Sequence, residues 1–133
     1  MRETAIAYEE VSPFAFQKTL ERARQALAEL GFGILCEIDV QATLKKKVGV
    51  DRPPYVILGA CHAPSAHEAL EQEPQVGVLL PCNVTVSEEQ GKVVVRAMRP
   101  AGALSVLEKA NLAQVGEHVG GLLREVVRKT CQD

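Results

Sequence analysis

The sequence contains no tryptophan, and aromatic residues make up only 4% of its 133 residues. Neither sign of charge is in large excess, because 15 Lys and Arg stand against 17 Asp and Glu, for a formal net charge of −2. Proteins that bind nucleic acid need a basic surface, so this balance argues against nucleic acid as a partner. Long apolar runs are also missing, and none approaches the roughly 18 residues of a membrane span.

The first residues are not followed by an apolar core of signal-peptide length. Together with the missing membrane span, this predicts a cytoplasmic protein without a membrane partner. In a reducing compartment the cysteines are expected to be thiols rather than a disulfide framework. Their spacing contains no CxxC pair, which excludes a zinc ribbon and a thioredoxin-type motif. The four cysteines are Cys36, Cys61, Cys82 and Cys131.

The composition that remains is that of an ordinary soluble globular protein, with 47% hydrophobic and 24% charged residues. The chain is long enough to bury a core without disulfides or structural metals. We therefore expect a single domain over residues 1–133.

The best-supported helix lies over residues 12–31, where apolar residues recur at steps of three and four. Ser12 precedes a proline, which is a typical helix start, and Gly31 is placed to end the helix in the left-handed conformation. The apolar period then changes to two, which predicts a strand over 32–40 that turns Cys36 toward the core.

Further strands are expected over 2–8, 55–61, 76–87 and 93–98, with a hairpin turn at 88–92, and helices over 41–47, 65–71, 104–111 and from 114 onward. The order is roughly β-α-β-(α)-β-α-β-β-α-α. It predicts an α+β protein in which a mainly antiparallel sheet carries helices on one face. The last helix contains Gly116, Gly120 and Gly121, which indicate close packing. These glycines and an incompletely covered sheet would suit self-association.

Two unusual segments mark the expected site. Pro81 lies inside a predicted strand, where it removes a hydrogen-bond donor and favours an edge or a bulge. The stretch 59–64, GACHAP, leads from a strand into a helix, whose free N–H groups attract anions and lower the pKa of a nearby thiol. We expect a pocket where these two segments meet. Its predicted residues are Gly59, Cys61, His62, Pro81, Cys82 and Asn83.

Three interpretations of this region remain open. In one, Cys61 or Cys82 is a reactive thiolate with His62 as the neighbouring base, although adjacent residues of a strand point to opposite faces. In another, these side chains and His67 bind a soft metal such as zinc or copper, but their spacing follows no recognised pattern. In the third, both thiols face the core and the histidines lie on the helix surface, which is the commonest situation for free cysteine.

The segments 55–64, YVILGACHAP, and 76–84, VGVLLPCNV, together resemble the domain of unknown function 302 family. The helix over 12–31 and the strand that begins at Phe32 fit the same family. The resemblance implies an α+β fold related to the TATA-binding-protein-like class, with a curved antiparallel sheet, and it implies homodimers. The family has no established activity, so the resemblance supplies no mechanism. Its pattern often has asparagine at the position of His62, which argues against a mechanism that needs an imidazole there.

The leading prediction is a non-catalytic binding or interaction protein, with a pocket for a small molecule or an anion near Cys61 and Cys82. The alternative is a thiol-dependent enzyme or a soft-metal-binding protein that uses Cys61, Cys82 and His62. The expected partners are a second copy of the chain and a small ligand, without nucleic acid or membrane. The sequence identifies neither a cofactor nor a substrate.

Overall fold

The computed structural model describes residues 1–107 and 109–132 of the chain. Its strands are β1 (Arg2–Glu3), β2 (Ala7–Ser12), β3 (Gly33–Asp39), β4 (Tyr55–Cys61), β5 (Cys82–Glu89) and β6 (Lys92–Met98). Its α-helices are α1 (Phe16–Glu29), α2 (Val40–Val48), α3 (Ala63–Gln72), α4 (Pro100–Leu104) and α5 (Ala110–Cys131). Two short 3-10 helices are η1 (Pro74–Leu79) and η2 (Ser105–Leu107).

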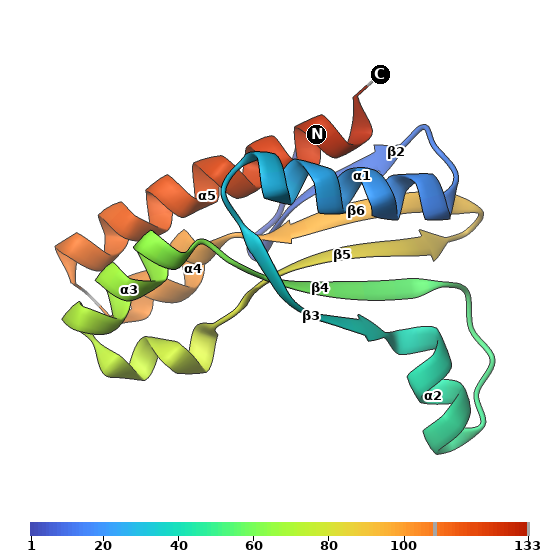
Figure 1. Ribbon diagram of the computed structural model, residues 1–133, viewed down its shortest axis with the longest axis horizontal. Coiled ribbons are helices and arrows are strands. Elements are labelled where there is room, and N and C mark those ends of the chain that lie inside the picture. Colours follow the sequence, from blue (N-terminus) through green and yellow to red (C-terminus); the bar gives the residue numbers. More distant parts are fainter. Residues whose placement is uncertain (108, 133) are drawn as a thin grey trace.

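The six strands form one antiparallel sheet in the order β1-β2-β6-β5-β4-β3. The helices α1 and α5 pack against each other and cover one face of this curved sheet (Figure 1). The predicted α+β architecture, with an antiparallel sheet and helices on one face, is confirmed. Within the described residues, no helix combines the length and the apolar character needed to cross a bilayer.

The core lies between the sheet and these two helices. Leu58, Val84 and Val95 come from three neighbouring strands, and none of them exposes any surface. Leu27 of α1 and Leu123 of α5 are fully buried above them. Burial of each such side chain contributes about 1.5–3 kcal/mol to folding. The apolar side chains that alternate along the strands therefore pack against those spaced by three and four residues on α1, and together they form one core layer.

The N-terminal strand and the start of α1 differ from the prediction. A turn separates β1 from β2, because Thr4 Oγ1 accepts the Ala7 N–H at 2.9 Å. The strand β2 covers Ala7–Ser12. The single strand predicted over 2–8 is therefore replaced by two strands, of which the longer lies further along the chain. Ser12 Oγ accepts the Phe14 N–H at 3.1 Å, but α1 begins only at Phe16. The helix start predicted at Ser12 was therefore wrong.

The end of α1 is the one predicted. Gly31 has a φ of +86°, which a residue with a side chain rarely adopts. Its N–H donates to the Ala28 carbonyl at 3.2 Å, and the Phe32 N–H donates to the Leu27 carbonyl at 2.9 Å. These two bonds form a Schellman motif, which ends the helix and turns the chain directly into β3.

The edge strand β3 contains a bulge that the sequence pattern did not reveal. The bulge lies at Leu35, between Ile34 and Cys36, and it shifts the alternation of the strand. Cys36 consequently pairs with Gly59 and shares the uncovered face of the sheet with it. Cys36 is exposed, so the prediction that it faces the core was wrong.

The strand predicted over 76–87 begins only at Cys82. Residues Pro74–Leu79 form η1 instead, in which Val76 is buried and Val78 is exposed. Pro81 has no N–H to donate, so the ladder starts after it. The strand β5 is central in the sheet, and the predicted position of Pro81 at an edge or a bulge was wrong.

Two of the three glycines in α5 allow close packing within the chain. A Cβ at Gly116 would lie 3.1 Å from Leu104 Cδ1, and a Cβ at Gly120 would lie 3.1 Å from Tyr8 Oη. A Cβ at Gly121 would meet open space. The predicted helix over 104–111 is divided among the end of α4, η2 and the start of α5, with residue 108 outside the described residues.

Candidate functional site

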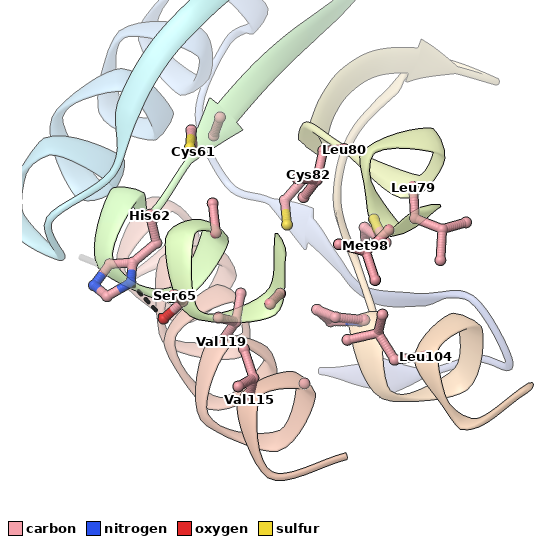
Figure 2. A pocket seen from close by; sticks show the side chains of 16 residues that line it. Cys61, His62, Ser65, Leu79, Leu80, Cys82, Met98, Leu104, Val115 and Val119 are labelled. Carbon is pink, nitrogen blue, oxygen red and sulfur yellow. Dashed lines mark hydrogen bonds between the residues drawn. The ribbon is translucent and has the colours of Figure 1, made fainter. Parts of the chain in front are cut away.

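A small cavity lies where β4 and β5 meet α3, η1, α4 and α5 (Figure 2). Its volume is about 50 Å³. Most of its walls are aliphatic, and this apolar part is formed by Ala60, Ala66, Ala69, Val76, Leu79, Leu80, Met98, Pro100, Leu104, Val115, Gly116 and Val119. The other lining residues are His62, Ser65 and the two thiols, Cys61 and Cys82. The cavity is therefore suited to an apolar group with one polar end.

The sheet register brings the two segments singled out in the sequence side by side. Ala60 near the end of β4 pairs with Cys82 at the start of β5. Cys61 and Cys82 both line the cavity, the first half-buried and the second buried. The antiparallel pairing of β4 with β5 thus creates the juxtaposition that the sequence only suggested.

The chemistry of Cys82 is that of a core thiol. Burial, with a smaller contribution from Cys61, raises the pKa of Cys82 to about 11. At neutral pH the side chain is therefore protonated, whereas a nucleophilic cysteine must be a thiolate. The environment of Cys82 argues against a thiol-dependent enzyme that uses it as the nucleophile.

His62 lies at the rim of the cavity, at the residue that precedes α3. Its Nδ1 is 2.7 Å from Ser65 Oγ, a contact drawn in Figure 2. The ring centroid lies 5.5 Å from that of Phe32 and 5.9 Å from that of His118. Among the described residues no hydrogen bond joins His62 to either thiol. The imidazole therefore has a structural environment rather than that of a base beside a thiol.

The soft-metal interpretation lacks a cluster of ligands. In the part of the chain that the structure describes, no three His, Cys, Asp or Glu side chains are close enough together to hold a metal ion. His67, the remaining ligand considered, is exposed on α3 and does not line the cavity.

Three of the predicted site residues lie outside the cavity lining. A Cβ on Gly59 would lie 2.5 Å from Cys36 Sγ and 3.0 Å from Pro81 Cγ, so these residues pack together on the uncovered face. Asn83 is exposed, and strand alternation directs it away from the side of Cys82. Gly59, Pro81 and Asn83 thus adjoin the cavity through the backbone only.

Several lining residues were missed in the sequence. Ser65 follows His62 by three residues, which is the spacing at which the first residues of a helix contact each other, so this pair was recognisable. Met98, Leu104 and Val115 gave no such signal, because they come from three different elements that only the tertiary fold brings together.

Residues 8–130 match the model of the domain of unknown function DUF302. A solved structure, that of an uncharacterized conserved protein DUF302 from Bacillus stearothermophilus, is similar to this chain with a TM-score of 0.88 and 26% sequence identity. The similarity covers 95% of this chain and 98% of the other. No curated protein matches the sequence. Because the family match extends over 8–130, the chain belongs to the family defined by the domain of unknown function DUF302.

Proposed function

We propose that this protein is a non-catalytic binding protein, which takes a small molecule with a short apolar body into the cavity beside Cys61 and Cys82. The apolar lining of the cavity is the observation that carries this proposal. The described lining residues include no Lys or Arg, so an anion entering the cavity would lose its hydration without gaining a countercharge. The lining therefore favours a neutral ligand over an anion.

The size and the rim of the cavity narrow the ligand further. Each water-sized group needs roughly 10–15 Å³ of such volume, so the cavity holds only a few non-hydrogen atoms. Ser65 is buried and has its Oγ beside the His62 ring, where a ligand hydroxyl or amide could exchange into the hydrogen bond. A short alcohol, or the end of a longer amphiphile, has the matching chemistry.

Titration followed by NMR tests this proposal with a pair of probes of similar size, 1-propanol and propionate. We expect saturable shifts in the amide signals of Ala60, Ala66 and Val119 with 1-propanol, and no saturable shifts with propionate. Equal or stronger binding of propionate would contradict the preference for a neutral ligand. The absence of saturable shifts with both probes would contradict the cavity as a binding site.

A filling substitution and a matched control locate the binding. Ala69 lines the cavity, whereas Ala113 is exposed on α5, so Ala69→Leu should abolish the response to 1-propanol and Ala113→Leu should leave it unchanged. A second pair guards against a folding defect in Ala69→Leu. Cys82→Ser makes the cavity more polar and should weaken binding of 1-propanol. Cys131→Ser is its control, because it changes a similarly buried thiol outside the cavity.

We further propose that the protein is a homodimer. The family resemblance and the uncovered face and edge of the sheet support this proposal. Sedimentation equilibrium tests it directly, because the chain has a mass of 14.4 kDa and a dimer would sediment with twice that mass.

A further inference from the structure

The edge strand β3 and the helix α2 form an arm that is largely uncovered within the chain, although Arg24 of α1 binds Glu37 of β3. Every residue of β3 is exposed, including Ile34, Leu35 and Ile38, and no residue of α2 is buried. The two elements are continuous, because Asp39 ends β3 and its carboxylate accepts the Ala42 N–H at the start of α2. An edge strand also presents unpaired backbone N–H and C=O groups, so this arm offers both apolar surface and hydrogen bonds to a partner.

The opposite edge of the sheet is protected. Its strand, β1, has only two residues, and both are charged. Arg2 pairs with Glu9 at 3.6 Å, and Glu3 pairs with Arg99 at 2.9 Å. Short, charged edges of this kind resist the addition of another strand. Of the two edges, β3 is therefore the one open to a partner.

Opposite charges lie at the two ends of the border that contains β3. In Figure 1, β3 forms the lower border of the sheet, with α3 and η1 toward its left end and α2 at its right end. Lys45, Lys46 and Lys47 occupy the last turn of α2. At the other end, α3 exposes Glu68 and Glu71, which lie three residues apart on one side of the helix.

These charges have no strong partners within the chain. Among the described residues, Lys46, Lys47, Glu68 and Glu71 take part in no salt bridge, although Lys45 pairs with Asp51 at 2.8 Å. Exposed apolar side chains accompany the glutamates, namely Leu70 of α3 and Val78 of η1. The border thus combines a basic end, an apolar strand and an acidic end.

We propose that two copies of this chain pair through their β3 edges about a two-fold axis, with Lys46 and Lys47 of each copy against Glu68 and Glu71 of the other. A half-turn about an axis perpendicular to the view of Figure 1 makes the two β3 strands antiparallel. The same half-turn places α2 of each copy opposite α3 and η1 of the other, so basic meets acidic at both ends. This reciprocity is the rule of a two-fold interface. The inference rests on the proposed homodimer and specifies its surface.

Lysine substitutions at two exposed apolar positions test the surface. Leu35 lies on β3, whereas Val11 is exposed on the uncovered face of β2, at a distance from this edge. In sedimentation equilibrium, Leu35→Lys should raise the dimer Kd at least about tenfold, and Val11→Lys should change it less than about twofold. Dissociation by Val11→Lys with an intact Leu35→Lys dimer would overturn the proposal and favour the uncovered face as the interface.

Charge reversal tests the pairing of the helices without relying on a loss of folding. The double variants Lys46→Glu with Lys47→Glu, and Glu68→Lys with Glu71→Lys, should each weaken self-association at least about tenfold, because like charges then face each other. An equimolar mixture of the two should recover dimers of mixed composition, since every contact is again between opposite charges. Failure of the mixture to dimerise would overturn the proposed pairing.

The wild-type result separates the two proposals. A protein that stays monomeric at every concentration would refute the homodimer and this surface together. A wild-type dimer that survives Leu35→Lys and both double charge reversals would refute this surface and leave the homodimer standing. Neither result bears on the binding of 1-propanol, which is measured in the cavity.

Discussion

The two faces of the sheet are stabilised by different interactions, although the same strands supply both. On the covered face, Leu58, Val84 and Val95 are fully buried under α1 and α5. On the uncovered face, the Arg96 guanidinium lies between the carboxylates of Glu9 and Glu89. The covered face is thus held by the removal of apolar surface from water, and the uncovered face is ordered by charge-assisted hydrogen bonds between side chains of neighbouring strands.

Stability is expected to come from the covered face, and tolerance of change from the uncovered face. Burial of aliphatic side chains is the larger contribution, and it fixes where the helices lie. Ion pairs that water reaches contribute little unless several charges act together, as Arg96 and its two carboxylates do. Four measurements test this contrast between the covered and the uncovered face.

Cys36 and Cys82 lie on opposite faces of the sheet, and their rates of alkylation should differ strongly. Cys36 is exposed, while burial raises the pKa of Cys82 to about 11. That rise alone lowers the thiolate fraction at neutral pH roughly a hundredfold relative to an ordinary thiol. We therefore expect iodoacetamide at pH 7 to label Cys36 at least about a hundred times faster than Cys82, as measured by peptide mass spectrometry. Comparable rates in the native protein would instead indicate a reactive, accessible Cys82.

Leu58 and Ile57 are neighbours on β4 that point to the covered and the uncovered face. Leu58→Ala should lower the free energy of unfolding by about 2–5 kcal/mol, because it leaves a cavity in the core. Ile57→Ala should cost less than half as much, since Ile57 is only half-buried. Urea unfolding measures both values. Equal losses would mean that the uncovered face is buried in solution, for example by a partner.

Arg96→Met tests the network on the uncovered face. It removes the cation that holds Glu9 and Glu89 together, and we expect a loss of about 1–2 kcal/mol in the free energy of unfolding. Arg24 offers a matched control, because it also contacts two carboxylates, but these are more exposed: the side chains of Glu21 and Glu37 are 73% and 40% exposed, against 16% and 39% for Glu9 and Glu89. Arg24→Met should cost less than about 0.5 kcal/mol. An equal loss of unfolding free energy in Arg24→Met and Arg96→Met would show that the network on the uncovered face is no more stabilising than an ordinary surface ion pair.

Acid should weaken the same network. Hydrogen bonds from Arg96 and then Ser87 lower the pKa of Glu89 to about 2. Because the folded pKa lies below the unfolded value of about 4.3, this stabilisation is complete above about pH 4.5 and is lost as the pH falls toward 2. After allowance for the partial exposure of Glu89, the loss is about 1 kcal/mol. Urea unfolding at pH 5 and pH 2.5 should show this loss in the wild type and a smaller one in Arg96→Met.

Much of the fold was predictable, because local sequence patterns indicate individual strands and helix ends. The strand Tyr55–Cys61 and the left-handed Gly31 were read correctly, since an uninterrupted apolar run and a glycine after a helix have few alternatives. Alternation failed at Val76 and Val78, because two turns of 3-10 helix between prolines present the same apolar residues as a strand. It failed again at Cys36, because the bulge in β3 exchanges the two faces to which the following side chains point, and no residue type in the sequence indicates a bulge there.

Only some of the residues that line the cavity could be predicted from the sequence. The pair Cys61 and Cys82 stood out through two unusual segments, and antiparallel pairing brought them together. Leu104 and Val115 complete the walls from elements far along the chain, and no local pattern indicates which helices will meet. Sequence periodicity can identify the buried side of an element, but the neighbour across the gap depends on the tertiary fold.

The direct junction of β3 with α2 has a consequence for how far any assembly could grow. Asp39 is both the last residue of the strand and the cap of the helix, so no flexible link separates them. A chain that added itself to this border would meet a rigid obstacle after seven residues. Together with the charged, two-residue border on the other side, this obstacle makes endless stacking into fibrils unfavourable, although one long apolar border stays open.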